Sequence, residues 1–138
     1  MKLTLDQVYK HLKNFVEDAE GKDYCSCSFE VNKRTYLGRQ SKITPTKKGE
    51  FVTLWIRVNG ETHPFEEIDA IDYVFILNYT KTGFFLFPKV VLLEKGILKS
   101  NSKNGKRGFR LYSPNYTDLN TQATKTQNWQ KNFYQSLI

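Results

Sequence analysis

Long hydrophobic runs are missing from this chain of 138 residues. The longest apolar stretches lie around residues 73–77 and 84–87, whereas a membrane-spanning helix needs about 20 consecutive apolar residues. The first residues also lack the apolar stretch of a secretory signal. We therefore expect a cytoplasmic protein that has no membrane segment.

Cysteine is scarce, and Cys25 and Cys27 stand one residue apart. A disulfide between residues at this spacing is strained. A closed zinc site needs about four ligands, and the chain adds two histidines as soft candidates. We predict buried or half-buried thiols, with no metal and no cofactor.

Proline and glycine are also few, at 4 and 8 residues, whereas Phe, Tyr and Trp number 10, 8 and 2. Disordered chains are poor in aromatic residues, so we expect one folded domain over residues 1–138. The 21 Lys and Arg residues outnumber the 14 Asp and Glu residues, which gives a formal charge of +7. This charge favours nucleic acid, an acidic protein or an anionic membrane surface as partner, although many basic domains bind none of them.

Hydrophobic periodicity predicts helices at both ends of the chain and strands between them. Residues 4–18 have the spacing of an amphipathic helix, and a second long helix begins near Asn120, with apolar spacing as far as Leu137. A short helix over residues 89–95 follows Pro88. Strands are predicted at residues 24–31, 35–42, 51–58, 73–79, 84–87 and 107–112.

The order of these elements predicts an α+β domain in which helices flank a mixed sheet. The strand over 35–42 is polar and is expected near an edge of the sheet. The strands over 73–79 and 84–87 are apolar on both faces and should form a central hairpin. Asn59-Gly60 supplies a turn after the strand over 51–58.

Four segments are more polar or more specific than folding requires. They are residues 39–49, 87–89, 105–110 and 120–130. Lys and Arg neutralise phosphates, Thr hydroxyls and turn amides bond phosphate oxygens, and Gln and Asn pair with adenine. Each segment also has a simpler interpretation, namely a solvated loop, a tight turn or a solvated helix face, and Trp129 fits the core stripe of the last helix.

Catalytic patterns are weak. No serine stands in a nucleophile elbow, and the histidines have no obvious Ser or Cys partner. A group of carboxylates precedes the strand at 73–79 and could hold Mg²⁺ for phosphodiester cleavage, or could be an ordinary charged loop: Glu66, Glu67, Asp69 and Asp72.

The chain resembles the MepB family in four stretches that follow the family's order from about residue 24 to residue 133. They are RxxKxTPTKxGxFVTLW at 39–55, FxFPK at 85–89, GKRGxRxY at 105–112 and QAxxTQxWQ at 122–130. All four polar segments fall within these motifs.

The resemblance implies a nucleic-acid-binding domain with a restriction-endonuclease-like core, which runs helix, three strands, helix, strand. The catalytic signature of that core is an Asp, followed on the next strand by an acid and a Lys two positions apart. Asp72 and Lys89 could stand for the Asp and the Lys, but Phe87 occupies the position of the second acid. A metal would then keep too few charged oxygen ligands, so binding without cleavage is favoured.

We therefore predict that the chain binds nucleic acid, DNA rather than RNA, through phosphate contacts and without catalysis. The predicted contacts are Arg39, Lys42, Thr44, Lys47, Lys48, Lys89, Lys106, Arg107, Arg110, Lys125 and Gln127. One alternative is a metal-dependent nuclease that uses Asp69 or Asp72 with Lys89. The other is a protein that binds a small anionic metabolite or an acidic protein.

Overall fold

Two sheets hold most of the strands in the computed structural model, which describes residues 13–17, 24 and 26–137 and, for 13–17, the backbone alone. The larger sheet has the order β1 (Lys13–Glu17), β2 (Cys27–Val31), β3 (Arg34–Gln40), β8 (Tyr73–Leu77), β9 (Gly83–Pro88) and β11 (Tyr134–Ser136). The smaller sheet has the order β10 (Gly108–Leu111), β5 (Glu50–Thr53) and β4 (Lys42–Ile43). The pair β3–β8 is parallel and the other pairs are antiparallel, so the larger sheet is mixed.

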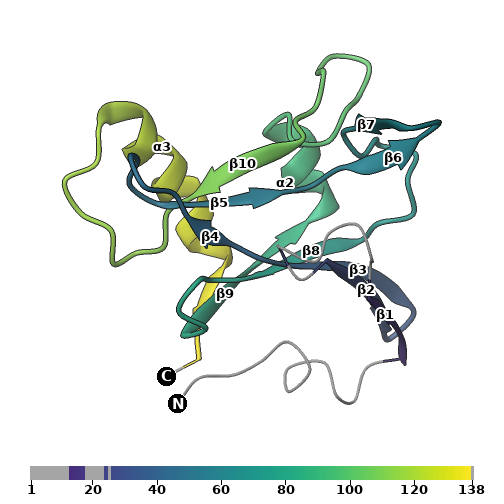
Figure 1. The fold of residues 1–138 in the computed structure, drawn as a ribbon, viewed down its shortest axis with the longest axis horizontal. Coiled ribbons are helices and arrows are strands. Elements are labelled where there is room, and N and C mark those ends of the chain that lie inside the picture. Colours follow the sequence, from purple (N-terminus) through teal and green to yellow (C-terminus); the bar gives the residue numbers. More distant parts are fainter. Residues whose placement is uncertain (1–12, 18–23, 25, 138) are drawn as a thin grey trace.

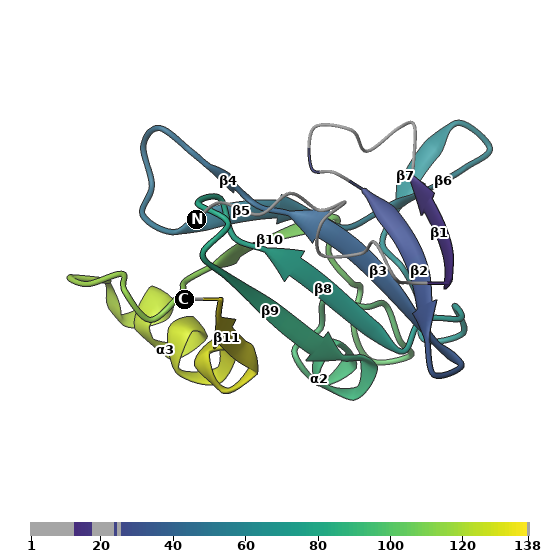
Figure 2. The ribbon, with the colours of Figure 1, turned by 90° about the horizontal axis from the view of Figure 1, so that it is seen from below.

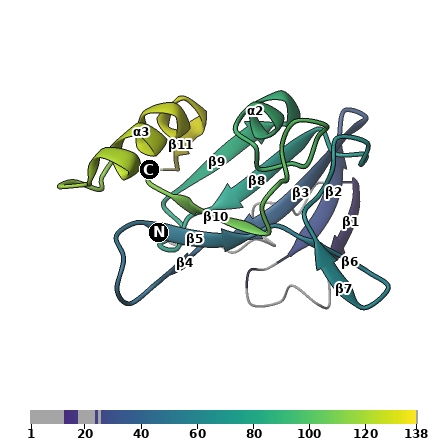
Figure 3. The same ribbon diagram turned by 90° about the horizontal axis from the view of Figure 1, so that it is seen from above.

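A hairpin and two helices complete the described fold. The hairpin of β6 (Ile56–Val58) and β7 (Glu61–His63) projects beyond the sheets (Figure 1). Helix α2 (Lys89–Glu94) follows β9, and α3 (Thr121–Gln130) leads through a 3-10 turn (Lys131–Phe133) into β11. Figure 2 shows the larger sheet from below, and Figure 3 shows α3 beside β10. No helix in the described residues is long and apolar enough to cross a membrane.

The main hydrophobic core lies between the two sheets. Alternation on each strand explains this, because successive side chains of a strand point to opposite faces. The smaller sheet contributes Val52 and Phe109, and the larger sheet contributes Val74 and Phe87, with Leu92 added by α2. A second apolar cluster on the other face of the larger sheet contains Cys27, Phe29, Phe75 and Leu77. The prediction of a buried thiol is confirmed for Cys27, whereas Cys25 lies outside the described residues.

The α+β class with a mixed sheet is confirmed, as are the hairpin of β8 and β9 and the Asn59-Gly60 turn. Both turn residues have positive φ, at 52° and 82°. The short helix after Pro88 and the start of the last helix at Asn120 are also confirmed. The restriction-endonuclease-like core, which runs helix, three strands, helix, strand, remains a prediction. Over residues 73–133 the observed order is strand, strand, helix, strand, helix (β8, β9, α2, β10 and α3).

Four expectations about the elements are wrong, at least in part. The helix over 4–18 is replaced at Lys13–Glu17 by β1, which pairs with the outer edge of β2, while residues 4–12 and 18 lie outside the described part. The polar strand is central, because β3 pairs with β2 on one side and β8 on the other. The strand over 51–58 divides where buried Leu54 enters the core. The last helix ends at Gln130, since the following residues pair with β9 as β11.

Candidate nucleic-acid interface

The outer face of the smaller sheet carries a row of three side chains. Phe51 on β5 lies opposite Lys42 on β4 and opposite Arg110 on β10. Side chains of directly opposed residues share a face in an antiparallel pair, so a half-buried aromatic ring stands between two cations. Gly108 permits this arrangement, because a Cβ there would come within 2.6 Å of the Phe51 ring.

Arg110 fastens the loop between β4 and β5 to β10. Its Nη2 donates to Thr44 Oγ1 at 2.9 Å and to the Lys48 carbonyl at 2.8 Å. Lys48 in turn donates from Nζ to the carbonyls of Thr117 and Asp118, at 3.1 and 2.9 Å. Arg110 and Lys48 therefore link the β4–β5 loop to β10 and to the loop before α3, and the oxygens that accept their hydrogen bonds are uncharged.

Gly49 allows the same loop to lie close to β10. Its φ is +82°, and a Cβ at this position would meet the Tyr112 ring at 2.6 Å and the Leu111 carbonyl oxygen at 2.8 Å. Only glycine adopts this conformation readily. The glycine of the family motif at 39–55 thus has a structural role in placing Lys47 and Lys48.

A groove of about 860 Å³ is lined by residues of β10, the β4–β5 loop and α3. Five cationic side chains and one carboxylate, that of Asp118, are among the residues that line it: Lys47, Lys48, Lys95, Lys106 and Arg110. Within the described part of the chain, none of these five cations lies within 4.0 Å of a carboxylate oxygen. The groove therefore carries positive charge that the protein itself does not neutralise by ion pairing. We call it the cationic groove.

Helix α3 forms one side of the cationic groove and is fixed to β10 by a buried amide. Gln130 is fully buried, its Oε1 accepts from Tyr112 N at 2.8 Å, and its Nε2 donates to the Arg110 carbonyl at 2.9 Å. Asn120 caps the start of the helix, because its side chain accepts from Ala123 N at 2.8 Å. The polar residues of this helix are thus partly structural.

Four of the predicted contact residues line the cationic groove together: Lys47, Lys48, Lys106 and Arg110. Thr44 contacts Arg110 directly. Lys42 lies on the same sheet face, with its Nζ 5.1 Å from the centroid of the Tyr24 ring. The segments at 39–49 and 105–110 are therefore brought together by the pairing of β4, β5 and β10.

The remaining predicted contacts lie elsewhere. Arg39 is buried and donates to the Gly38 carbonyl, Lys89 donates to the Asp69 carbonyl at 2.6 Å, and Gln127 donates to the carbonyls of Ser113 and Tyr116. These three side chains are held by neighbouring backbone rather than presented in the groove.

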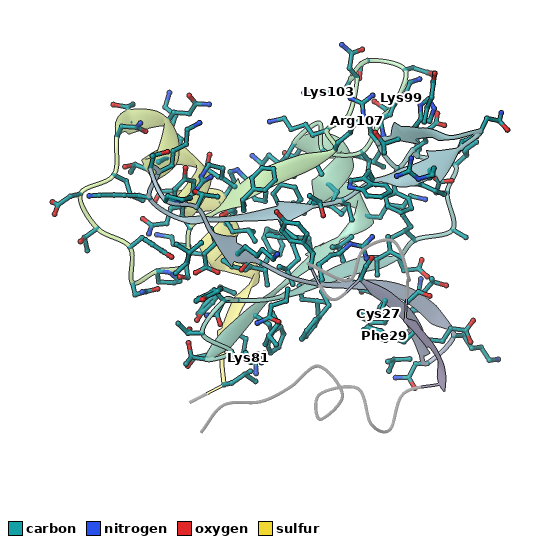
Figure 4. The ribbon with its side chains drawn as sticks, viewed as in Figure 1. Cys27, Phe29, Lys81, Lys99, Lys103 and Arg107 are labelled. Carbon is teal, nitrogen blue, oxygen red and sulfur yellow. The ribbon has the colours of Figure 1, made fainter. Side chains whose placement is uncertain are left out.

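Arg107 and Lys125 are exposed but do not line the groove. Arg107 Nε donates to the Thr62 carbonyl, and the side chain of Lys125 is exposed on α3. Figure 4 shows Arg107 with Lys99 and Lys103 in the loop after α2. This loop extends the positive surface beyond the groove, toward the β6–β7 hairpin.

The carboxylates before β8 have structural partners. Asp72 Oδ2 accepts from Thr35 N at 2.8 Å, which ties β8 to β3, and Asp69 Oδ2 accepts from Glu66 N at 2.7 Å. Arg34 lies 3.9 Å from Asp72. Among the residues that the structure describes, no group of three or more His, Cys, Asp or Glu side chains could hold a metal ion.

Two residues of this region escaped the sequence reasoning. Lys95, the C-cap residue of α2, lies with its Nζ 5.3 Å from the centroid of the Trp129 ring, which packs on Phe87 as the core stripe predicted. Glu50 is buried at 5% exposure and bonds Ser41, Tyr79 N and Tyr116. Glu50 stands two residues before buried Val52 on the same strand, and side chains at this spacing share a face. This spacing was the signal in the sequence that Glu50 faces inward.

Burial, followed by the charge of Glu50, raises the pKa of the Tyr116 phenol well above its ordinary value. The same two causes raise the pKa of Tyr134. Both phenols are therefore neutral near pH 7, and Tyr116 can act as a hydrogen-bond donor to the Glu50 carboxylate.

The fold and the groove together define a class: small α+β proteins in which a three-stranded sheet packs on a larger mixed sheet, and a cationic groove lies between the smaller sheet and the last helix. A family model described as MepB-like matches residues 18–136. A solved structure described as "Crystal Structure of MepB" aligns with a TM-score of 0.88 and 34% identity, over 96% of this chain and 93% of that chain. The chain belongs to the MepB-like family. Comparison with curated proteins found no match.

Proposed function

We propose that this protein binds nucleic acid in the cytoplasm, DNA rather than RNA, by contacting phosphates in the cationic groove and without catalysis. The observation that carries the proposal is the gathering of Lys47, Lys48, Lys95, Lys106 and Arg110 around one groove. None of them is paired with a carboxylate of the described chain.

Unpaired cations favour a polyanion because each phosphate that they neutralise releases condensed counterions. The sites of positive charge come from three separate parts of the chain, the β4–β5 loop, the end of α2 and the start of β10. A small anion would need few of them. An extended phosphate backbone can run past all of them in succession, while Lys48 and Arg110, which also bond neighbouring oxygens, add their charge. The exposed Lys99 and Lys103 continue the positive surface past the groove.

Hydrogen-bond donors other than ammonium groups also line the cationic groove. The amide side chains of Asn120, which caps α3, and of Gln122 on α3 are among its lining residues. Side chains of these types contact phosphate and sugar oxygens in protein–DNA interfaces. The arrangement supports binding that follows the backbone of the nucleic acid.

Fluorescence anisotropy with short single- and double-stranded DNA and RNA, at several salt concentrations and with or without Mg²⁺, tests the proposal. We expect binding whose log–log dependence on salt has a slope of several units on duplex DNA, about −0.9 for each phosphate neutralised. Intact oligonucleotide after incubation with Mg²⁺ would argue against the nuclease alternative. Absence of binding at low salt would overturn the proposal.

Single variants assign the binding to the groove. Lys47→Ala and Lys106→Ala should each lower the magnitude of the salt slope by about 1 and leave the melting temperature unchanged, since both side chains are exposed. Lys131→Ala is the matched control, because Lys131 is exposed and does not line the groove. An equal effect of all three substitutions would show that binding depends on net charge alone.

A further inference from the structure

A second cavity, of about 400 Å³, lies on the other side of the loop at residues 113–116. It is bordered by the start of β5, the turn between β8 and β9, this loop and β11, which meet in the lower left part of Figure 1. No lysine or arginine is among its lining residues, in contrast with the cationic groove. Ile43, Pro114 and the phenol rings of Tyr116 and Tyr134 provide its apolar surface. The other lining residues are polar: Glu50, Asn78, Thr80, Thr82, Ser113, Asn115 and Ser136.

Glu50 supplies this cavity with a buried carboxylate that has an acceptor position left. Oε1 accepts from Ser41 Oγ and from Tyr79 N, the latter at 2.9 Å, and Oε2 accepts from Tyr116 Oη at 2.9 Å. Each carboxylate oxygen can accept two hydrogen bonds. Within the described residues, Oε1 is therefore saturated and Oε2 has room for one more donor.

Tyr134 supplies a donor on the same cavity. Its Oη accepts from Asn78 Nδ2 at 3.4 Å, and the described residues include no acceptor for its own proton. The charge of Glu50 contributes to the raised pKa of Tyr134, so the phenol and the carboxylate lie within electrostatic reach of each other. The cavity thus offers one strong acceptor and one donor beside two aromatic rings and two apolar side chains.

These features favour a neutral planar ligand over a cation. Arg110 is close enough to oppose the rise in the pKa of Tyr116, so its positive charge reaches this cavity and disfavours a cationic ligand. An ammonium group would also lose hydration beside the rings and the apolar side chains, which is costly. A neutral heterocycle with an amino group next to a ring nitrogen would donate to Glu50 and accept from Tyr134 at a smaller cost.

We propose that the cavity binds one unstacked nucleobase that carries an exocyclic amino group beside a ring nitrogen acceptor. Cytosine and adenine both have this pair of groups. The inference rests on the proposed function, since a nucleic acid in the cationic groove would deliver the base. The loop connects the two sites, because Asp118 and Leu119 line the groove while residues 113–116 line the cavity. A strand that crosses this loop would place its phosphates on one side and a base on the other.

Two probes separate the sites in a ¹H–¹⁵N NMR titration. Cytidine carries a base and no phosphate, and we expect it to shift the amides of residues 78–83, 113, 115 and 116 in a saturable way. Inorganic phosphate should shift residues 46–48 and 106–110 instead. Cytidine shifts without phosphate shifts would uphold the base cavity and weaken the proposed function. Phosphate shifts without cytidine or adenosine shifts would overturn the base cavity and leave the proposed function standing. Stronger binding of adenosine than of cytidine would assign the cavity to adenine.

The amino group and the phenol proton are tested one at a time. Pyrimidin-2-one riboside lacks the amino group of cytidine and should bind about tenfold more weakly, as expected for one hydrogen bond to a charged acceptor. Tyr134→Phe should weaken cytidine binding while leaving the phosphate shifts unchanged. The control is Tyr79→Phe, which changes an exposed tyrosine in the turn between β8 and β9. Equal affinity for the two nucleosides would overturn the proposal without depending on any variant.

Discussion

Gln130 gives the sharpest quantitative prediction, because one buried side chain satisfies two backbone groups of β10. Replacement by Met keeps the length and most of the volume but leaves Tyr112 N and the Arg110 carbonyl without their partners. Each buried polar group that loses its hydrogen bond costs about 1–3 kcal/mol. The free energy of unfolding should therefore fall by roughly 2–6 kcal/mol, a large part of the stability of a domain of this size.

Urea unfolding monitored by circular dichroism measures this change. Gln135→Met is the matched control, because Gln135 is exposed on β11 and should change the free energy of unfolding by less than about 0.5 kcal/mol. A loss below about 0.5 kcal/mol for Gln130→Met would refute the reasoning, since it would mean that water or a shifted neighbour satisfies the edge of β10. Gln130→Glu should lose stability too, because a carboxylate oxygen would face the Arg110 carbonyl.

Three further predictions concern titration, backbone conformation and the limits of the groove. Burial and Glu50 raise the pKa of Tyr116 in the folded protein, so the neutral phenol contributes its full stabilisation below pH 10, where the phenol of the unfolded chain titrates. This contribution is lost as the pH rises from 10 toward the higher pKa of the folded phenol. Tyr116→Phe should therefore flatten the fall in unfolding free energy between pH 9 and 11. Gly49→Ala should lower the free energy of unfolding by about 1–3 kcal/mol, as measured in urea, because its Cβ would collide with Tyr112; an unchanged value would contradict the close approach. Lys125→Ala should leave the salt slope of DNA binding within error of the parent in the anisotropy titration, and a drop of one unit would enlarge the interface to the outer face of α3.

Much of the fold was predictable because local signals and tertiary structure agree. The apolar runs of β8 and β9, the Asn59-Gly60 turn and the cap at Asn120 each have a local cause that the structure retains. The failures occur where pairing partners decide. Lys13–Glu17 forms a strand because the edge of β2 is available to it, and residues 134–136 leave the helical pattern because β9 pairs with them.

The candidate site was predictable in composition but only partly in placement. The sequence indicates which segments are basic, and strand pairing determines which of them meet. Lys47 and Arg110 come together because β4, β5 and β10 are neighbours. Lys89 has the same charge, but its ammonium group is taken by the Asp69 carbonyl. Gln127 and Gln130 look alike as polar residues of one helix, and only the position of the loop and of β10 shows that both are bonded to backbone.

The smaller sheet has a consequence for the order in which the protein can acquire its structure during synthesis. Its strands β4 and β5 leave the ribosome early, but β10 comes more than fifty residues after β5, and α3 follows later still. A nascent chain can pair β8 with β9 before residue 108 has been synthesised. At that stage β10 and α3, which form two sides of the groove, are both missing. Binding competence should therefore appear abruptly, when the segment that ends at Gln130 is released, and not grow in proportion to chain length.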